Sequence, residues 1–214
     1  MRSRFDAQLA ALNKEMMEMG TLCVEVISLA SNALSRGSRE FAAQIAPIDR
    51  EINQKERDIE SLCLKLLLQQ QPVARDLRVI SAALKMITDM ARIGKQAQDI
   101  AEIISFSQAR PAGLQIHMDE MAKATMDMVH HSVDAYVTHD TTLAHEVIAF
   151  DDVVDASFDE IKTSLIEIIA KNPADGQYAL DLLMIAKYFE RIGDHAVNIA
   201  QWVVFSVTGI HKEE

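Results

Sequence analysis

Glu190-Arg-Ile-Gly-Asp-His-Ala-Val-Asn-Ile-Ala200 is a near copy of an earlier stretch, Ala91-Arg-Ile-Gly-Lys-Gln-Ala-Gln-Asp-Ile-Ala101. The later copy carries carboxylates at Glu190 and Asp194, four residues apart, so on a helix both point from one side. The earlier copy has an alanine and a lysine at those two positions. The pattern predicts an internal duplication in which one copy alone keeps the acidic pair.

The duplication extends through the rest of the chain. When Asp49 is set against Asp151, two helix-like segments of each half align without a gap, and the third aligns after a shortening of three residues. Around the shared Arg-Ile-Gly, six of 14 columns are identical. We therefore predict two tandem three-helix bundles, the first repeat over residues 1–110 and the second over residues 111–214.

The sequence predicts an all-α fold of six long helices. With 7 Gly and 4 Pro in 214 residues, it contains few helix breakers. Gly37 and Ser38 are expected to end one helix and cap the next, Pro47 to kink or break the second, and Pro72 to open the third. Arg110-Pro-Ala-Gly113 marks the repeat boundary. Apolar spacing places the helices at about residues 5–34, 38–68, 73–107, 114–137, 141–171 and 177–207.

The net charge of −11 disfavours nucleic-acid binding, which requires cations that replace the counterions of phosphate. It suits cations or basic partner surfaces. Cys23 and Cys63 lie in apolar helical patterns and are expected to be reduced core residues. The first residues lack the apolar run of a signal peptide, and no charge-free apolar stretch could span a membrane. We expect a soluble cytoplasmic protein with no direct membrane insertion.

Two acidic pairs form the candidate metal site. Asp151 and Asp155 lie one turn apart on the fifth predicted helix, as Glu190 and Asp194 do on the sixth. Because neighbouring helices would bring the pairs together across one groove, their mutual repulsion calls for a cation. Carboxylate oxygens without Cys suit Mg, Mn, Ca or Fe better than tetrahedral Zn. Solvated acidic pairs are also common on so acidic a chain, so both interpretations stay open.

The first repeat differs at the corresponding positions. Asp49 is kept, but Asn53, Ala91 and Lys95 replace the other three acids. We predict an Asp49–Lys95 contact that makes a cation unnecessary there. The mid-helix glycines of the two Arg-Ile-Gly copies cost helix stability, about 1 kcal/mol against Ala, and are expected at close helix contacts.

Gln71-Pro-Val-Ala-Arg-Asp-Leu-Arg78, together with the stretch at Glu190–Ala200, resembles the PhoU family over nearly the whole chain. The resemblance implies tandem three-helix bundles and a cytoplasmic negative regulator of phosphate transport and of the phosphate regulon. It implies two partners, the ATPase of the phosphate ABC transporter and the sensor histidine kinase of the regulon. Some members bind metal clusters through acidic pairs, which carries over to Asp151, Asp155, Glu190 and Asp194. The ion would be divalent or ferric: Fe, Mn, Mg, Zn or Ca.

Two functions follow as expectations. The first is a non-enzymatic adaptor between transporter and kinase, with a homodimer as the expected assembly. The alternative is a carboxylate-bridged metalloenzyme, an oxidase or hydrolase, on the same helical bundle. A substrate-sized apolar pocket beside the four acids would favour the enzyme, whereas a shallow, open acidic face would favour the adaptor.

Overall fold

The structure, a computed structural model, describes residues 2–70, 73–107 and 118–211. These residues form long α-helices joined by short turns, and no strand occurs among them. The expected all-α fold is thus confirmed. The helices are α1 (Arg2–Arg36), α2 (Arg39–Gln70), α3 (Ala74–Phe106), α4 (Met118–Thr138), α5 (Thr141–Lys171) and α6 (Gly176–Thr208), with a 3₁₀ turn, η1 (Pro173–Asp175), before α6.

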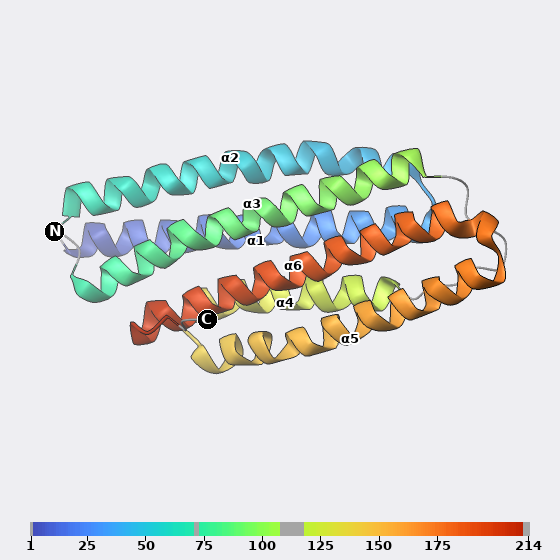
Figure 1. Cartoon of the computed structure of the whole chain (residues 1–214). Coiled ribbons are helices and arrows are strands. Elements are labelled where there is room, and N and C mark those ends of the chain that lie inside the picture. Colours follow the sequence, from blue (N-terminus) through green and yellow to red (C-terminus); the bar gives the residue numbers. More distant parts are fainter. Residues whose placement is uncertain (1, 71–72, 108–117, 212–214) are drawn as a thin grey trace.

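The helices lie side by side as two three-helix bundles (Figure 1). In the first bundle α2 packs on both α1 and α3, and in the second α6 packs on both α4 and α5. Two helix pairs join the bundles: α3 packs on α6, and α1 packs on α4. The chain runs in opposite directions along α3 and α6 (Figure 1). The two helices that carry the Arg-Ile-Gly copies therefore form an antiparallel pair between the two bundles.

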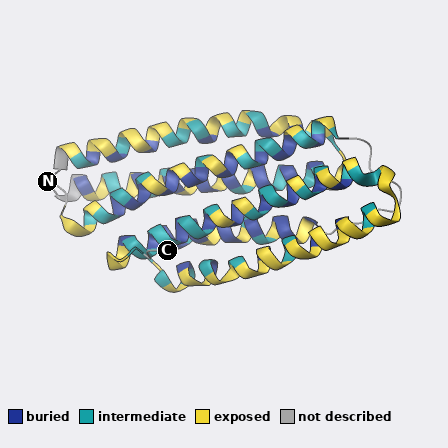
Figure 2. Ribbon diagram, viewed as in Figure 1, coloured by how far each residue is buried: buried dark blue, intermediate teal, exposed yellow. Residues whose placement is uncertain are grey.

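The helices form because apolar residues recur at three and four positions, which gives each helix one stripe to bury. On α1, for example, Leu12, Met16, Met19 and Cys23 are fully inaccessible. Buried residues face the interior of each bundle and exposed residues face outward (Figure 2). Both cysteines are buried and free, as expected for core residues. Within the described ranges, no helix combines the length and apolar character that crossing a membrane requires.

The turns within the two repeats match, as the alignment predicts. Gly37 ends α1 with φ of 60°, and the backbone N–H of Phe41 lies 3.5 Å from Ser38 Oγ at the start of α2. In the second repeat His139 takes the left-handed position with φ of 56°, and Asp140 Oδ1 accepts hydrogen bonds from the N–H groups of residues 142 and 143. Each repeat thus reverses direction by a left-handed residue followed by a side-chain cap.

The short break that was one of the two expectations at Pro47 does not occur in α2. The helix continues without a break from Arg39 to Gln70, with Pro47 inside it. Pro47 is exposed and removes only one backbone donor, whereas Ile45 and Ile52 on either side of it are fully buried. Packing against α1 and α3 therefore outweighs the local cost of the proline. The expected roles of Pro72 and of residues 110–113, and the predicted start of the fourth helix near residue 114, lie outside the described residues.

Candidate functional site

The four predicted acids lie on two neighbouring helices and act on one another electrostatically. Asp151 and Asp155 are on α5, Glu190 and Asp194 are on α6, and the two helices pack together. Burial, together with the negative charges of the neighbouring carboxylates, foremost Asp155, Asp194 and Glu190, raises the pKa of Asp151 to about 6. The pKa of Asp194 is raised by burial and by the charges of Glu190 and Asp155. We call these four side chains the acid cluster.

Gly193 sets the distance between α5 and α6 at the acid cluster. A Cβ atom added to Gly193 would lie 3.3 Å from Asp151 Oδ1 and 3.4 Å from Val154 Cγ1. The first repeat repeats this arrangement more tightly, since a Cβ on Gly94 would lie 2.8 Å from Asp49 Oδ1. The prediction that both glycines lie at helix contacts is confirmed. In each repeat the absent side chain lets an aspartate of one helix lie against the backbone of the next.

Glu190 is the less exposed of the two acid-cluster members on α6, and an ion pair partly neutralises its charge. Its Oε1 accepts a hydrogen bond from Lys187 Nζ, and its side chain is 14% exposed. Its Oε2 is buried and accepts no hydrogen bond. The Lys187 ammonium also lies 5.4 Å from the centre of the Phe158 ring. A cation that bound Glu190 would therefore compete with Lys187 for this carboxylate.

The donor atoms of the acid cluster fit a hard cation. All are carboxylate oxygens, the ligands that Mg²⁺ and Ca²⁺ take and that also serve Mn and non-haem Fe. Among the residues that the structure describes, no group of three or more His, Cys, Asp or Glu side chains is arranged so that it could hold a metal ion. Coordination would thus require Glu190 to leave Lys187 and the exposed Asp155 and Asp194 side chains to turn toward Asp151 and Glu190.

In the first repeat the predicted Asp49–Lys95 contact is replaced by another pair. Lys95 Nζ lies 2.8 Å from Asp99 Oδ1, one turn further along α3. Asp49 Oδ1 is buried and accepts no hydrogen bond. The Lys95 side chain is 60% exposed, so it reaches the nearer partner on its own helix without losing water. Lys95 still acts on Asp49 at longer range: burial raises the pKa of Asp49, and the ammonium charge opposes that rise.

A further polar cluster between the repeats was not predicted. Asp89 on α3 is 7% exposed, and its Oδ1 lies 2.9 Å from His195 Nδ1 and 3.4 Å from Asn198 Nδ2, both on α6. A signal was present in the sequence. Asp89 occupies a position of the apolar stripe between Met86 and Ile93, where a charged residue needs a partner.

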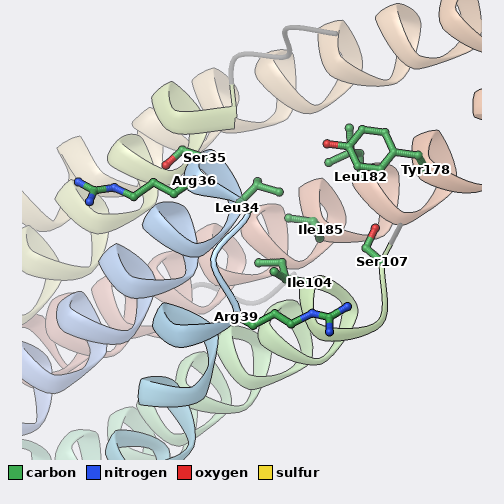
Figure 3. Close-up of a pocket in the computed structure, with 10 residues that line it drawn as sticks. Leu34, Ser35, Arg36, Arg39, Ile104, Ser107, Tyr178, Leu182 and Ile185 are labelled. Carbon is green, nitrogen blue, oxygen red and sulfur yellow. The ribbon is translucent and has the colours of Figure 1, made fainter. Parts of the chain in front are cut away.

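The cavities that the described residues line include two that lie away from the acid cluster. One of about 460 Å³ is formed by the α1–α2 turn, the end of α3 and the start of α6 (Figure 3). Its floor is apolar, and Arg36 and Arg39 stand at its margin, with Arg36 extended away from the other side chains (Figure 3). The other cavity, of about 240 Å³, lies between α4 and α5 and is lined by residues that include His131 and Glu146. Neither includes a member of the acid cluster, so neither gives the alternative metalloenzyme a substrate pocket there.

Comparison with known proteins identifies the repeat. The PhoU domain family matches the chain twice, over residues 16–104 and 118–203. A Burkholderia protein named "Phosphate-specific transport system accessory protein PhoU homolog" is 31% identical over 97% of this chain and 90% of its own length. A Pseudomonas aeruginosa protein of the same name is 31% identical over 96% of this chain and 86% of its own length.

Solved structures agree with the arrangement of the helices. The crystal structure of PhoU from Pseudomonas aeruginosa superposes with a TM-score of 0.88 at 30% identity, covering 96% of this chain and 100% of that one. The phosphate transport system regulatory protein PhoU from Streptococcus pneumoniae has a TM-score of 0.89 at 24% identity, over 98% of this chain and 100% of its own. The second likeness concerns the fold alone.

Proposed function

The chain belongs to the PhoU family, and from that premise we propose that it is a non-enzymatic accessory regulator of a phosphate-specific transport system. The observation that carries the proposal is the family match over both repeats, which covers most of the described residues. The names of the relatives, accessory and regulatory proteins of phosphate transport, support this reading.

Within that role we propose an adaptor that acts in the cytoplasm. It would contact the ATPase of the phosphate ABC transporter and the sensor histidine kinase of the phosphate regulon, and hold the kinase in its inhibitory state when phosphate is plentiful. A homodimer is the proposed assembly. Long helices joined by short turns offer extended flat faces to such partners, and the acidic surface suits basic patches on them.

We further propose that the acid cluster binds a divalent or ferric cation, with Asp151, Asp155, Glu190 and Asp194 as ligands. A bound cation would neutralise the repulsion among the four carboxylates and fix the spacing of α5 and α6. Asp151 Oδ1 lies close to Gly193, so this ligand would stand at the contact between α5 and α6. Glu190 would exchange Lys187 for the cation.

Removal of the gene from its own host tests the regulatory role. We expect a phosphate-regulon reporter to be expressed in phosphate-rich medium in the deletion strain, and repression to return when the gene is supplied again. A reporter that stays repressed in the deletion strain contradicts the proposal. Co-purification with the transporter ATPase and with the kinase, each tested alone, then separates the two proposed contacts.

A further inference from the structure

Asp89 provides a buried polar link between the two repeats. It lies on α3 of the first repeat, and both of its hydrogen-bonding partners lie on α6 of the second. The side chains of Asp89 and His195 are 10% and 13% exposed. A carboxylate in such a place is stabilised only by the groups that bond to it, so its position and theirs depend on each other.

The partners of Asp89 stand next to the acid cluster in the sequence and around the helix. His195 directly follows Asp194, and Asn198 follows Asp194 by one turn. Successive helical residues are about 100° apart around the axis, since a turn contains about 3.6 residues. When His195 is held against α3, Asp194 therefore lies about 100° further around α6, one residue beyond Gly193, which packs on α5. Because Asn198 bonds to the same oxygen, α6 is held at two points that are nearly one turn apart.

The repeat that lacks the acidic pair also lacks the counterparts of Asp89 and His195. In the repeat alignment Gln96 takes the place of His195, and Tyr188 takes the place of Asp89. The Oε1 atom of Gln96 is buried and accepts no hydrogen bond. The hydrogen-bonding residues His195 and Asn198 thus lie on the helix that carries the acidic pair. Their acceptor, Asp89, comes from the other repeat.

We infer that Asp89 is a positioning residue for the acid cluster of the opposite repeat. Through its hydrogen bonds with His195 and Asn198 it fixes the rotation of α6, and so the direction in which Asp194 faces Asp151. This inference rests on the proposed ion site. It makes ion binding between α5 and α6 dependent on the packing of α6 against α3, and so links the site to the first repeat.

Calorimetric titration of the full chain with Mn²⁺ tests the inference, with Asp89→Ala and Asp89→Asn as the variants. Asp89→Ala removes the acceptor, and we expect binding about tenfold weaker, as for other residues that orient metal ligands. Asp89→Asn keeps an oxygen that accepts from His195, and we expect binding within about threefold of the unaltered chain. Asp76→Asn, which removes one charge at the far start of α3, is the matched control and should bind as the unaltered chain does.

The outcomes separate positioning from charge. If Asp89 acted only through its negative charge, Asp89→Asn and Asp89→Ala would weaken Mn²⁺ binding equally, and the inference would be overturned. Unchanged binding in Asp89→Ala would overturn it as well, while leaving the ion site intact. If the unaltered chain binds no Mn²⁺, both the proposed ion site and the inference that rests on it are contradicted.

A second variant and a second measurement guard against misfolding. If circular dichroism shows that Asp89→Ala does not fold, His195→Phe replaces it, since this change keeps a ring and removes the donor; binding about tenfold weaker is again expected. In the metal-free chain, ¹⁵N chemical shifts of the His195 ring should show a protonated Nδ1 in the unaltered protein and in Asp89→Asn, and its loss in Asp89→Ala. A ring that is identical in all three would show that Asp89 does not hold it.

Discussion

Asp49 and Asp151 occupy matching places in the two repeats and have opposite surroundings. Each lies against a mid-helix glycine of the next helix, Gly94 or Gly193. Burial raises the pKa of both carboxyls, but the charge of Lys95 opposes the rise at Asp49, whereas four further carboxylates reinforce it at Asp151. The comparison teaches that the aspartate–glycine contact belongs to the fold, since both repeats keep it. The charges around the contact are what distinguish the two sites.

The largest expected difference is in ion binding. Asp194→Ala should weaken binding by at least about tenfold, because it removes a proposed ligand from the second repeat. Asp49→Ala should leave binding unchanged, because the first repeat supplies no acidic pair. Metal content after purification and calorimetric titration measure both effects. Equal losses in the two variants would show that the repeats are not asymmetric in this respect.

The glycine contacts are expected to differ in tightness. Replacing glycine by alanine within a helix gains about 1 kcal/mol in helix propensity, whereas overpacking a filled contact costs about 1–3 kcal/mol. At Gly94 a Cβ would lie 2.8 Å from Asp49 Oδ1 and 3.1 Å from Ile52 Cδ1, so Gly94→Ala should lower the free energy of unfolding by up to about 2 kcal/mol.

Gly193→Ala is the matched control for this measurement. Its Cβ would lie 3.3 Å from the nearest atom, so crowding and helix propensity should nearly cancel, leaving a change within about 0.5 kcal/mol. Urea denaturation of both variants gives the two numbers. A larger loss at Gly193 than at Gly94 would reverse the order of tightness that the structure shows.

The pH dependence of stability should differ between the two aspartates. The pKa of Asp151 rises from 3.8 to about 6, so the folded protein binds this proton more tightly than the unfolded chain does. Stability therefore falls as pH rises between about 4 and about 6, as the charged form accumulates. In chelator, Asp151→Asn should be more stable than the unaltered chain by about 1 kcal/mol at pH 7, allowing for solvent screening, and by less near pH 4.

Asp49→Asn is the comparison for this experiment. The Asp49 carboxyl is also shifted upward by burial, but Lys95 opposes the shift, so the gain at pH 7 should be smaller than at Asp151. Denaturant unfolding at several pH values follows both variants. Gains of the same size, or a gain that grows toward acid pH, would contradict the proposed role of the neighbouring charges.

The smallest expected effect is at Lys95. Its ion pair with Asp99 is a surface pair one turn apart, and such pairs contribute about 0.3–0.5 kcal/mol. Lys95→Ala should therefore change the free energy of unfolding by less than about 0.5 kcal/mol, and raise the pKa of Asp49 further. Unfolding and carboxyl NMR titration measure the two effects. A loss of several kcal/mol would indicate that Lys95 is bound to Asp49 after all.

Much of the fold could be predicted because its causes are local. Apolar spacing predicted the helices, and the turns at Gly37–Ser38 and at Asp140 followed from residues that cap helices. The break expected at Pro47 does not occur, because the stability of that part of α2 comes from burial against α1 and α3. A proline indicates a local free-energy cost to the helix, and the sequence alone does not show how much burial of the neighbouring residues offsets that cost.

The placement of the four acids on two neighbouring helices was predictable, and their contacts were less so. Spacing of four placed Asp151 with Asp155 and Glu190 with Asp194 on common faces, and the structure brings these four charges within reach of one another. The partner of Lys95 was predicted wrongly, because a long exposed side chain can reach several acidic residues and the spacing does not show which one it contacts. The ion pair between Lys187 and Glu190 was likewise not predictable, because it depends on which side-chain rotamers the packing allows.

By itself, the sequence determined the duplication, the helical class and the unequal charge of the two repeats. These follow from composition and from periods of three and four residues, which act over single helical turns. Only the tertiary structure decided that Asp89 meets His195, since those residues are 106 positions apart. Which faces of α3 and α6 meet depends on the packing of both bundles at once, and no local pattern encodes a contact between them.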